Sequence, residues 1–127
     1  MAQINEQVIG GRPTRLFGPG EILSWPLSVT FANPSSNQKI LVDNILIRAS
    51  KSNTSATYFS LLDQVGMFYY KRVLMKAGEI KIIQLNFIIE YPNKLYSWRT
   101  KGDGSDDTLN ILYGMANGII YEPGNSL

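Results

Sequence analysis

Alternation of apolar and polar residues recurs along this chain of 127 residues and constrains its fold more than any other feature. In residues 38–50 (QKILVDNILIRAS), Ile45, Ile47 and Ala49 would share one face of an extended strand. Branched side chains dominate this stretch, which favours a strand in the middle of a sheet. Residues 79–91 (EIKIIQLNFIIEY) alternate with apolar side chains on both faces, which predicts a strand buried on both sides.

Shorter alternating stretches extend this pattern over most of the chain. Further strands are expected at residues 4–9, 22–31, 56–62, 67–75, 94–100, 108–113 and 119–121. Turn-forming residues separate them at 18–20 (GPG), 33–37 (NPSSN), 92–93 (PN), 102–104 (GDG) and 117–118 (NG). Because Pro26 cannot donate a hydrogen bond within a sheet, its strand is expected at an edge or with a bulge. In residues 58–65 (YFSLLDQV), one or two helical turns are the alternative.

About nine short strands at this spacing predict an all-β protein, an antiparallel β-sandwich that is jelly-roll-like. A chain of 127 residues with 44% hydrophobic and 17% charged residues is typical of one folded domain with one core. We expect this β-sandwich domain over residues 15–127. Residues 1–14 are expected to form an N-terminal arm, since Gly10, Gly11 and Pro13 make a joint after residues 4–9.

The charge of the chain argues against one class of partner. Its 12 basic and 10 acidic residues give a net charge of +2, far from the dense positive field that sequence-independent nucleic-acid binding requires. We therefore expect no nucleic acid as a partner. The N-terminus lacks a basic stretch followed by an apolar core, and no apolar run reaches the ~20 residues that span a bilayer. We expect no membrane association, and synthesis in a cytoplasm.

The sequence contains neither cysteine nor histidine. Thiolate and imidazole nucleophile systems and the commonest metal ligands are therefore excluded. Paired carboxylates remain, as in glycoside hydrolysis, and Glu21 and Glu79 each follow a turn glycine. Asp103, Asp106 and Asp107 share a glycine-rich loop, but it lacks the regular spacing of a calcium loop. We predict no catalytic residue, no cofactor and no metal, in a protein that is not an enzyme.

Aromatic residues are the remaining candidates for contact with a ligand. Trp25, Tyr96 and Trp98 would stack on a sugar or hold a protein partner if they were exposed, although aromatic side chains in strands more often pack in the core. In residues 67–73 (MFYYKRV), aromatic residues stand beside basic ones. Alternate residues of a strand point to opposite faces, so this stretch does not form one nucleic-acid platform.

Both ends of the chain carry apolar residues that need a partner. The segment over residues 119–121 is too short to be a stable strand alone and too apolar to remain in water. The run over residues 4–9 can add a strand to the sheet edge of a neighbouring subunit. The alternative is that both segments complete the sheets of their own subunit. The interface candidates are Ile4, Val8, Ile9, Ile119, Ile120 and Tyr121.

The order of elements in a little over half of the chain is distinctive. In residues 42–54 a strand ending in alanine leads to Ser52-Asn53-Thr54, and in residues 73–82 (VLMKAGEIKI) an Ala-Gly-Glu turn opens a long strand. In residues 93–113 a Leu-Tyr strand leads through a Gly-Asp loop to an apolar strand. This layout resembles that of small β-sandwich structural proteins of tailed-phage virions, of the head-decoration, head-fibre or tail-associated type. It departs from that layout where residues 59–62 continue a strand and where Asp106-Asp107 lengthens the later loop.

The resemblance implies a non-catalytic virion structural protein, made in the host cytoplasm, that docks on other virion proteins and on copies of itself. A capsid auxiliary or decoration subunit is the interpretation that we favour. A homo-oligomer is expected, first of all a trimer, because such assemblies are often three-fold. The alternative is a receptor- or carbohydrate-binding module of a phage tail, and a carboxylate-dependent glycan hydrolase is the third hypothesis.

Overall fold

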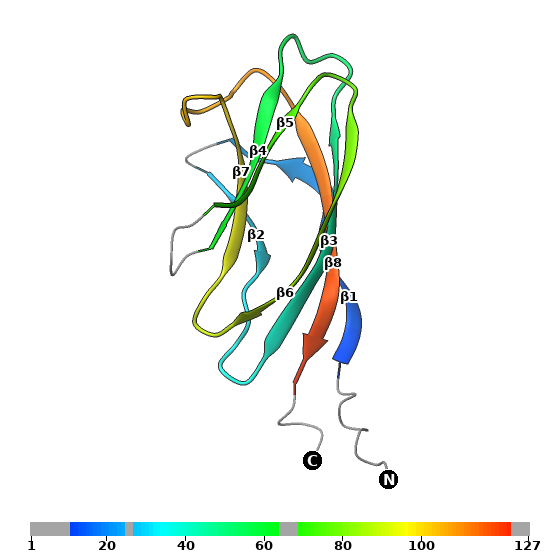
Figure 1. Ribbon diagram of the computed structural model, residues 1–127, viewed down its shortest axis with the longest axis vertical. Helices are drawn as coiled ribbons and strands as arrows, with labels where there is room; N and C mark the ends of the chain where they lie inside the picture. The colour runs from blue at the N-terminus through cyan, green and yellow to red at the C-terminus, as the bar shows by residue number, and fades with distance from the viewer. Residues whose placement is uncertain (1–10, 25–26, 64–68, 123–127) are drawn as a thin grey trace.

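The computed structural model describes residues 11–24, 27–63 and 69–122, which form eight strands and no helix (Figure 1). In chain order the strands are β1 (Gly11–Ile22), β2 (Val29–Ala32), β3 (Lys39–Ala49), β4 (Thr57–Asp63), β5 (Tyr69–Met75), β6 (Ile80–Glu90), β7 (Leu95–Thr100) and β8 (Leu112–Tyr121). The helical alternative for residues 58–65 is wrong over the part described, because that part belongs to β4. The strand expected at residues 4–9 lies outside the described residues.

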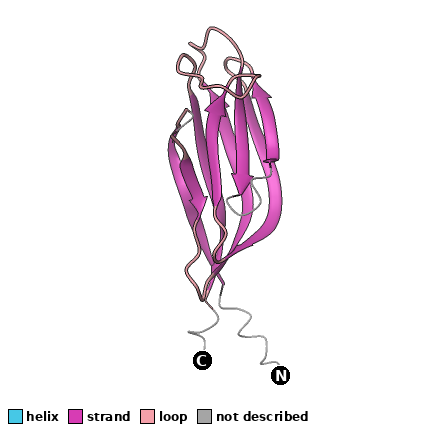
Figure 2. Cartoon of the chain, turned by 90° about the vertical axis from the view of Figure 1, so that its left-hand side faces the viewer, coloured by secondary structure: helices cyan, strands magenta, loops and turns pink. Residues whose placement is uncertain are grey.

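The strands form two antiparallel four-stranded sheets, in the orders β1-β8-β3-β6 and β2-β7-β4-β5. Among the pairings, β1 pairs with β8, β2 with β7, β3 with β6, and β4 with β5. Among the described strands, the first therefore pairs with the last, the second with the seventh, the third with the sixth and the fourth with the fifth. These strands follow the course of one long hairpin, with its tip between β4 and β5. Rolling this hairpin into two stacked sheets produces a jelly roll, which confirms the predicted antiparallel β-sandwich (Figure 2).

Alternation along each strand directs one face of each sheet into the core. Ile45, Ile47 and Ala49 are fully buried, as their pattern predicts. The rings of Phe17, Phe31 and Phe59 link three strands across the core, with centroids 5.4 and 6.2 Å apart in succession. The largest buried apolar side chains are Ile22, Val42, Ile45, Ile47, Phe59, Leu61, Met75, Ile89, Leu95 and Leu112.

The sequence-based expectation of two strands, at residues 108–113 and 119–121 with a turn at Asn117-Gly118, is wrong. The structure has one strand, Leu112–Tyr121, paired with β1 on one side and β3 on the other. Gly118 lies against the backbone of Leu41, next to a register shift around Asp43. The glycine here permits two strands to approach closely and does not make a turn.

The expectation of a turn at residues 18–20 is also wrong. This Gly-Pro-Gly segment lies inside β1, which keeps its pairing with β8 through register shifts between Arg15 and Gly20. Proline is tolerated there because β1 is an edge strand, with a neighbour on one side only. β1 begins at Gly11, so residues 11–14, which were assigned to the arm, pair with β8.

The strand expected over residues 22–31 is divided in two. Ile22 ends β1, and β2 begins at Val29 on the edge of the other sheet. Trp25 and Pro26 lie outside the described residues.

Substitution of Gly118 by alanine tests the close approach of β3 and β8. A Cβ at this position would overlap the Leu41 carbonyl oxygen and lie 2.8 Å from Leu16 Cδ1, so we expect a loss of roughly 1–3 kcal/mol in unfolding free energy. Urea unfolding measures it. In Gly102→Ala, the matched control, the new Cβ would lie at an ordinary 3.5 Å from Tyr58 Cε1, and we expect a change within about 0.5 kcal/mol. Equal stability of the two variants would contradict this account.

Candidate functional site

The outer faces of the two sheets differ in how much apolar surface they expose. On the β2-β7-β4-β5 sheet, which faces the viewer in Figure 2, the outward side chains of Ser60, Leu62 and Trp98 are at most 7% exposed. On the β1-β8-β3-β6 sheet, Ile80 and Ile82 are 62% and 68% exposed. The expectation that β6 is buried on both sides is therefore wrong, because β6 lies at a sheet edge and its outward side is uncovered.

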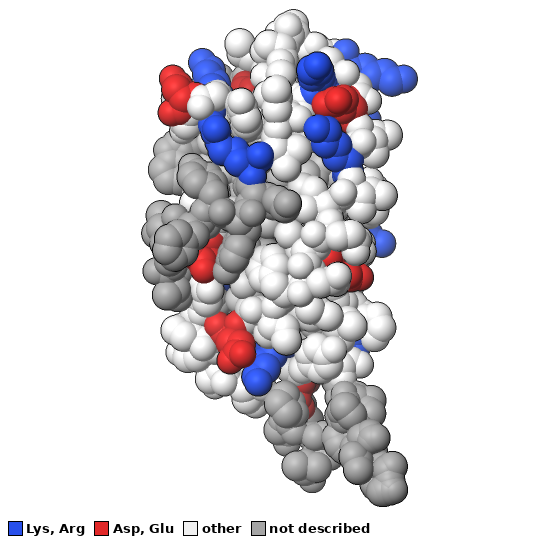
Figure 3. Space-filling view, viewed as in Figure 1, with Lys and Arg blue, Asp and Glu red and all other residues white. Residues whose placement is uncertain are grey.

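Strand register arranges the outward side chains of the β1-β8-β3-β6 sheet, which we call the open face, into rows across the strands. The upper apolar row is Met115, Leu46 and Ile82, and the lower apolar row is Ile119, Leu41 and Ile88. Between them, the polar row is Arg15, Asn117, Asn44 and Gln84. The two end rows are Tyr113, Arg48 and Ile80 above, and Tyr121, Lys39 and Glu90 below. Figure 3, viewed as in Figure 1, shows the side of the sandwich, with the open face turned to the right.

Hydrogen bonds between side chains hold the polar row in place. Arg15 Nε donates to Asn117 Oδ1 at 2.9 Å, and Asn117 Nδ2 donates to Asn44 Oδ1 at 3.1 Å. Asn44 Nδ2 in turn donates to Asp43 Oδ2 at 3.3 Å. The row thus links β1, β8 and β3 and fixes donors and acceptors at defined positions between two apolar rows.

Two hollows lie on the open face, both lined mostly by β1 and β8. The upper hollow, of about 340 Å³, includes Pro19, Gly20 and Met115 in its lining. The lower hollow, of about 400 Å³, is lined by residues that include Pro13 and Ile119. The most exposed isoleucines of the face stand on β6, at the opposite edge of the sheet. The lower hollow thus lies toward the β1 edge of the open face, whereas the upper hollow crosses the sheet, because Leu46 and Arg48 of β3 and Ile80 of β6 also line it.

Charged and aromatic side chains meet at the upper end row. The Arg48 guanidinium carbon lies 4.9 Å from the centroid of the Tyr113 ring, and both residues line the upper hollow. Arg48 is exposed, so its guanidinium can also contact an aromatic ring of a second molecule.

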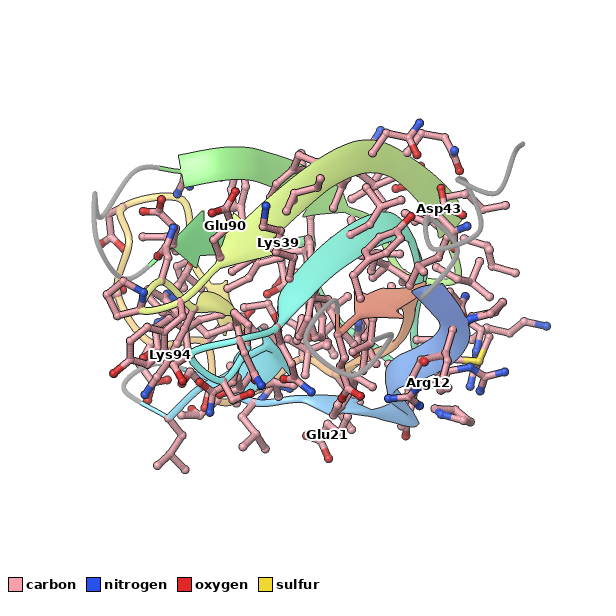
Figure 4. The ribbon with its side chains drawn as sticks, turned by 90° about the horizontal axis from the view of Figure 1, so that it is seen from below. Arg12, Glu21, Lys39, Asp43, Glu90 and Lys94 are labelled. Atoms are coloured by element: carbon pink, nitrogen blue, oxygen red, sulfur yellow. The ribbon has the colours of Figure 1, made fainter. Side chains whose placement is uncertain are left out.

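The carboxylates proposed for glycan hydrolysis are used in other ways. Glu21 Oε2 lies 3.2 Å from Arg99 Nη1, and Glu79 Oε1 accepts a hydrogen bond from the Lys76 backbone N–H. Among the described lining residues, the upper hollow contains Glu21 as its one acid, and the lower hollow contains Asp43. Figure 4 shows Glu21, Asp43 and Glu90 far apart. Neither hollow therefore brings two acids face to face, as that chemistry requires.

The acidic loop uses two of its carboxylates to hold its own backbone. Asp103 Oδ1 accepts hydrogen bonds from the Ser105 hydroxyl and backbone N–H, which lower the pKa of Asp103. Asp107 Oδ1 accepts from the backbone N–H groups of Leu109 and Asn110. Burial opposes the charged form of Asp107, but hydrogen bonds, with those from the side chains of Thr57 and Asn110 the largest, outweigh it and lower the pKa of this carboxyl.

The described residues hold no group of three or more acidic side chains placed to bind a metal ion. The absence of a metal requirement stays a prediction. So do the expected absences of catalysis, of a cofactor and of a nucleic-acid partner.

Two of the three sugar-binding candidates, Tyr96 and Trp98, lie on β7. Tyr96 is half-buried and Trp98 is 7% exposed, while Trp25 lies outside the described residues. The structure therefore offers no flat surface on Trp98 for stacking. In the basic–aromatic stretch, Arg72 lies over the Tyr58 ring, 4.1 Å from its centroid, and donates to the backbone oxygens of Lys101 and Gly102. This arginine anchors a loop.

The interface candidates at the chain ends fall into two groups. Ile4, Val8 and Ile9 lie outside the described residues. Ile119, Ile120 and Tyr121 belong to β8, where their backbones pair within their own subunit. Of these, Ile119 and Tyr121 point outward onto the open face, whereas Ile120 packs against the core.

Sequence reasoning did not find the open face. The sequence feature that could have revealed the open face is the presence of isoleucine on both sides of residues 79–91. From the sequence alone, that feature indicates burial on both sides of the strand.

No protein-family model matches this chain, and no curated protein matches it. Among solved structures, a chain of the infectious bursal disease virus (IBDV) particle overlaps 92% of this chain, with a TM-score of 0.52 and 12% sequence identity. A chain of the Gx strain of that virus overlaps 91% of it, with a TM-score of 0.48 and 12% identity. Tobacco streak virus coat protein overlaps 89% of this chain and 86% of its own length, with a TM-score of 0.41 and 11% identity.

This chain spans only about a third of the two bursal disease virus chains, 32% and 33% of their lengths. The overlap with the IBDV particle chain shows a shared fold. Separately, the described residues include no helix long and apolar enough to cross a membrane.

Substitution of Asp107 by asparagine tests the role of this carboxylate in the loop. Because the pKa of Asp107 is lowered by folding, its contribution to stability is present above the unfolded pKa of about 3.9 and is lost as the pH falls through the folded pKa. We expect Asp107→Asn to lower the unfolding free energy by about 1–3 kcal/mol near neutral pH.

The difference from the wild type should begin to narrow below about pH 4, where Asp107 of the unfolded chain becomes protonated, and should narrow further as the pH falls through the lowered pKa of the folded state. Urea unfolding near pH 7 and near pH 3 measures both values. Asp103→Asn, a change at an exposed position of the same loop, is the control and should have a smaller effect. If Asp107→Asn lowered the unfolding free energy by the same amount at both pH values, the proposed role of the charged Asp107 carboxylate would be contradicted.

Proposed function

We propose that this chain is a non-catalytic structural protein of a virion, which acts by docking and self-assembly. The open face is the observation that carries this proposal. The overlap of the jelly-roll fold with a chain of the IBDV viral particle supports it. The lack of paired acids in both hollows of the open face is consistent with a role that needs no catalysis.

The open face supports assembly because its exposed apolar area is unfavourable in water. Ile80, Ile82 and Ile88 are each at least half exposed. Full burial of one such side chain is worth about 1.5–3 kcal/mol. Large contiguous apolar patches on a folded domain mark sites where another molecule binds. The hydrogen-bonded polar row would give such a contact a defined register.

The finer assignment that we propose is a capsid auxiliary or decoration subunit, synthesised in the host cytoplasm and then bound to the virion. Its partners would be other virion proteins and copies of itself. We also propose that copies join in threes through the segment containing Ile4, Val8 and Ile9. The receptor- or carbohydrate-binding alternative is less favoured, because Trp98 is buried.

Counting this chain in purified particles tests the proposed function. Particles from producing cells would be isolated on a density gradient, and the chain quantified by mass spectrometry against the major shell protein. A decoration subunit is expected at a fixed, high ratio to the shell protein that survives repeated purification. A handful of copies would support a tail or vertex position, and absence from the particles would overturn the proposed function.

A further inference from the structure

We propose that the open face is a contact between two copies of this chain, related by a twofold axis that runs parallel to the strands between β8 and β3. The contact deepens the proposed self-assembly, on which it rests, by naming the partner of the open face. A half-turn about this axis places each row opposite the same row of the partner. The half-turn reverses the order of the strands, so that β1 faces the partner's β6 and β8 faces the partner's β3. Sheets packed in this aligned way keep their strands within about 30°.

Row-on-row packing matches apolar groups with apolar groups. In the upper apolar row, Met115 faces the partner's Leu46, and in the lower one Ile119 faces the partner's Leu41. The polar row meets the polar row, with Asn117 opposite the partner's Asn44. Hydrogen-bonding groups of the polar row therefore meet hydrogen-bonding groups of the partner's polar row.

The charges of the face select this axis over the other twofold arrangement. With the axis along the strands, Arg48 faces the partner's Tyr113 and Lys39 faces the partner's Tyr121, and both are favourable cation–aromatic contacts. With the axis across the strands, the end rows would exchange, and Lys39 would face the partner's Arg48. Like charges opposed in this way are unfavourable, so the arrangement along the strands is preferred.

The shape of the face fits the same axis. The hollows are lined mostly by β1 and β8, and the half-turn brings the partner's β6 over that edge of the sheet. Ile82 belongs to the same row as Met115 of the upper hollow, and Ile88 belongs to the same row as Ile119 of the lower hollow. Ile82 and Ile88, which line neither hollow, thus lie over the hollows of the other copy.

The size of the face predicts a reversible contact. Four strands spaced about 4.8 Å apart, with rows over about 27 Å of strand, cover roughly 500 Å² in each copy. The pair would bury roughly 1,000 Å² in total, below the ~1,200–2,000 Å² of stable specific interfaces and in the range of weak, transient ones. Association is therefore expected to depend on concentration.

The first test is light scattering coupled to size exclusion on the full chain, over a range of concentrations. Ile82→Glu places a charge in the upper apolar row, at a side chain that is 68% exposed, so folding is retained. We expect this variant to lose the twofold contact, and so to have half the molar mass of the wild type where no other contact joins copies and a lower mass than the wild type where the N-terminal segments also join them. Leu109→Glu is the matched control, because Leu109 is 75% exposed outside the open face, and its mass should not change.

The second test distinguishes this geometry from any other use of the face. Met115→Lys alone and Leu46→Glu alone should each lower the mass as Ile82→Glu does, since each puts an unpaired charge against an apolar side chain of the partner. An equimolar mixture of the two should recover the wild-type mass, because the lysine introduced in one copy then faces the glutamate introduced in the other. A thermal melt of each variant establishes that it is folded.

A wild-type mass equal to that of Ile82→Glu at high concentration would overturn the twofold contact, as would a mixture that does not recover. The proposed function would survive either result if the chain is still counted in particles. Conversely, a twofold pair in solution with no chain in particles would leave the contact standing and overturn the virion role.

Discussion

The pairing of β8 on both of its sides is the interaction on which the rest of the structure depends. β8 lies between β1 and β3, and it is the one neighbour of β1 in its sheet. A Cβ at Gly118 would overlap the Leu41 carbonyl oxygen, and one at Gly114 would lie 3.0 Å from Ile22 Cδ1. These glycines let the last strand of the chain close onto the first. Without β8 the long hairpin would not roll up, and the open face would lose its middle.

The two outer faces of the folded sandwich differ in how far their apolar side chains are exposed. Trp98 and Leu62 are buried on the outside of one sheet, where Leu74 is 39% exposed. The outside of the other sheet keeps Ile80 and Ile82 in water. This apolar area is not buried in the isolated chain. The free energy of burying it is gained only when a second molecule docks. The fold thus separates the contacts that hold one subunit together from those that join subunits.

Alternation in the sequence was enough to predict the sheets and the direction of the core, because it reports directly on which side of a strand is buried. The sequence pattern led to wrong predictions where one residue type occurs in two different structural settings. Glycine at 18 and 118 was interpreted as a turn signal, yet in β1 and β8 it lies within paired strands. Isoleucine on both sides of β6 was interpreted as burial, because a local pattern does not tell whether a strand lies at an edge. The open face depends on strand order, which only long-range pairing determines.

Methionine oxidation tests most directly whether the open face is the surface that assembly buries. Met115 lies in the upper apolar row and is half-buried in the free chain, whereas Met75 is fully buried in the core and serves as an internal reference. Dilute chain and purified particles would be treated with peroxide, and sulfoxide at each methionine measured by mass spectrometry. The account predicts that Met115 is oxidised in the dilute chain and protected in the particle, while Met75 is protected in both. Oxidation of Met115 at the same rate in both samples would contradict it.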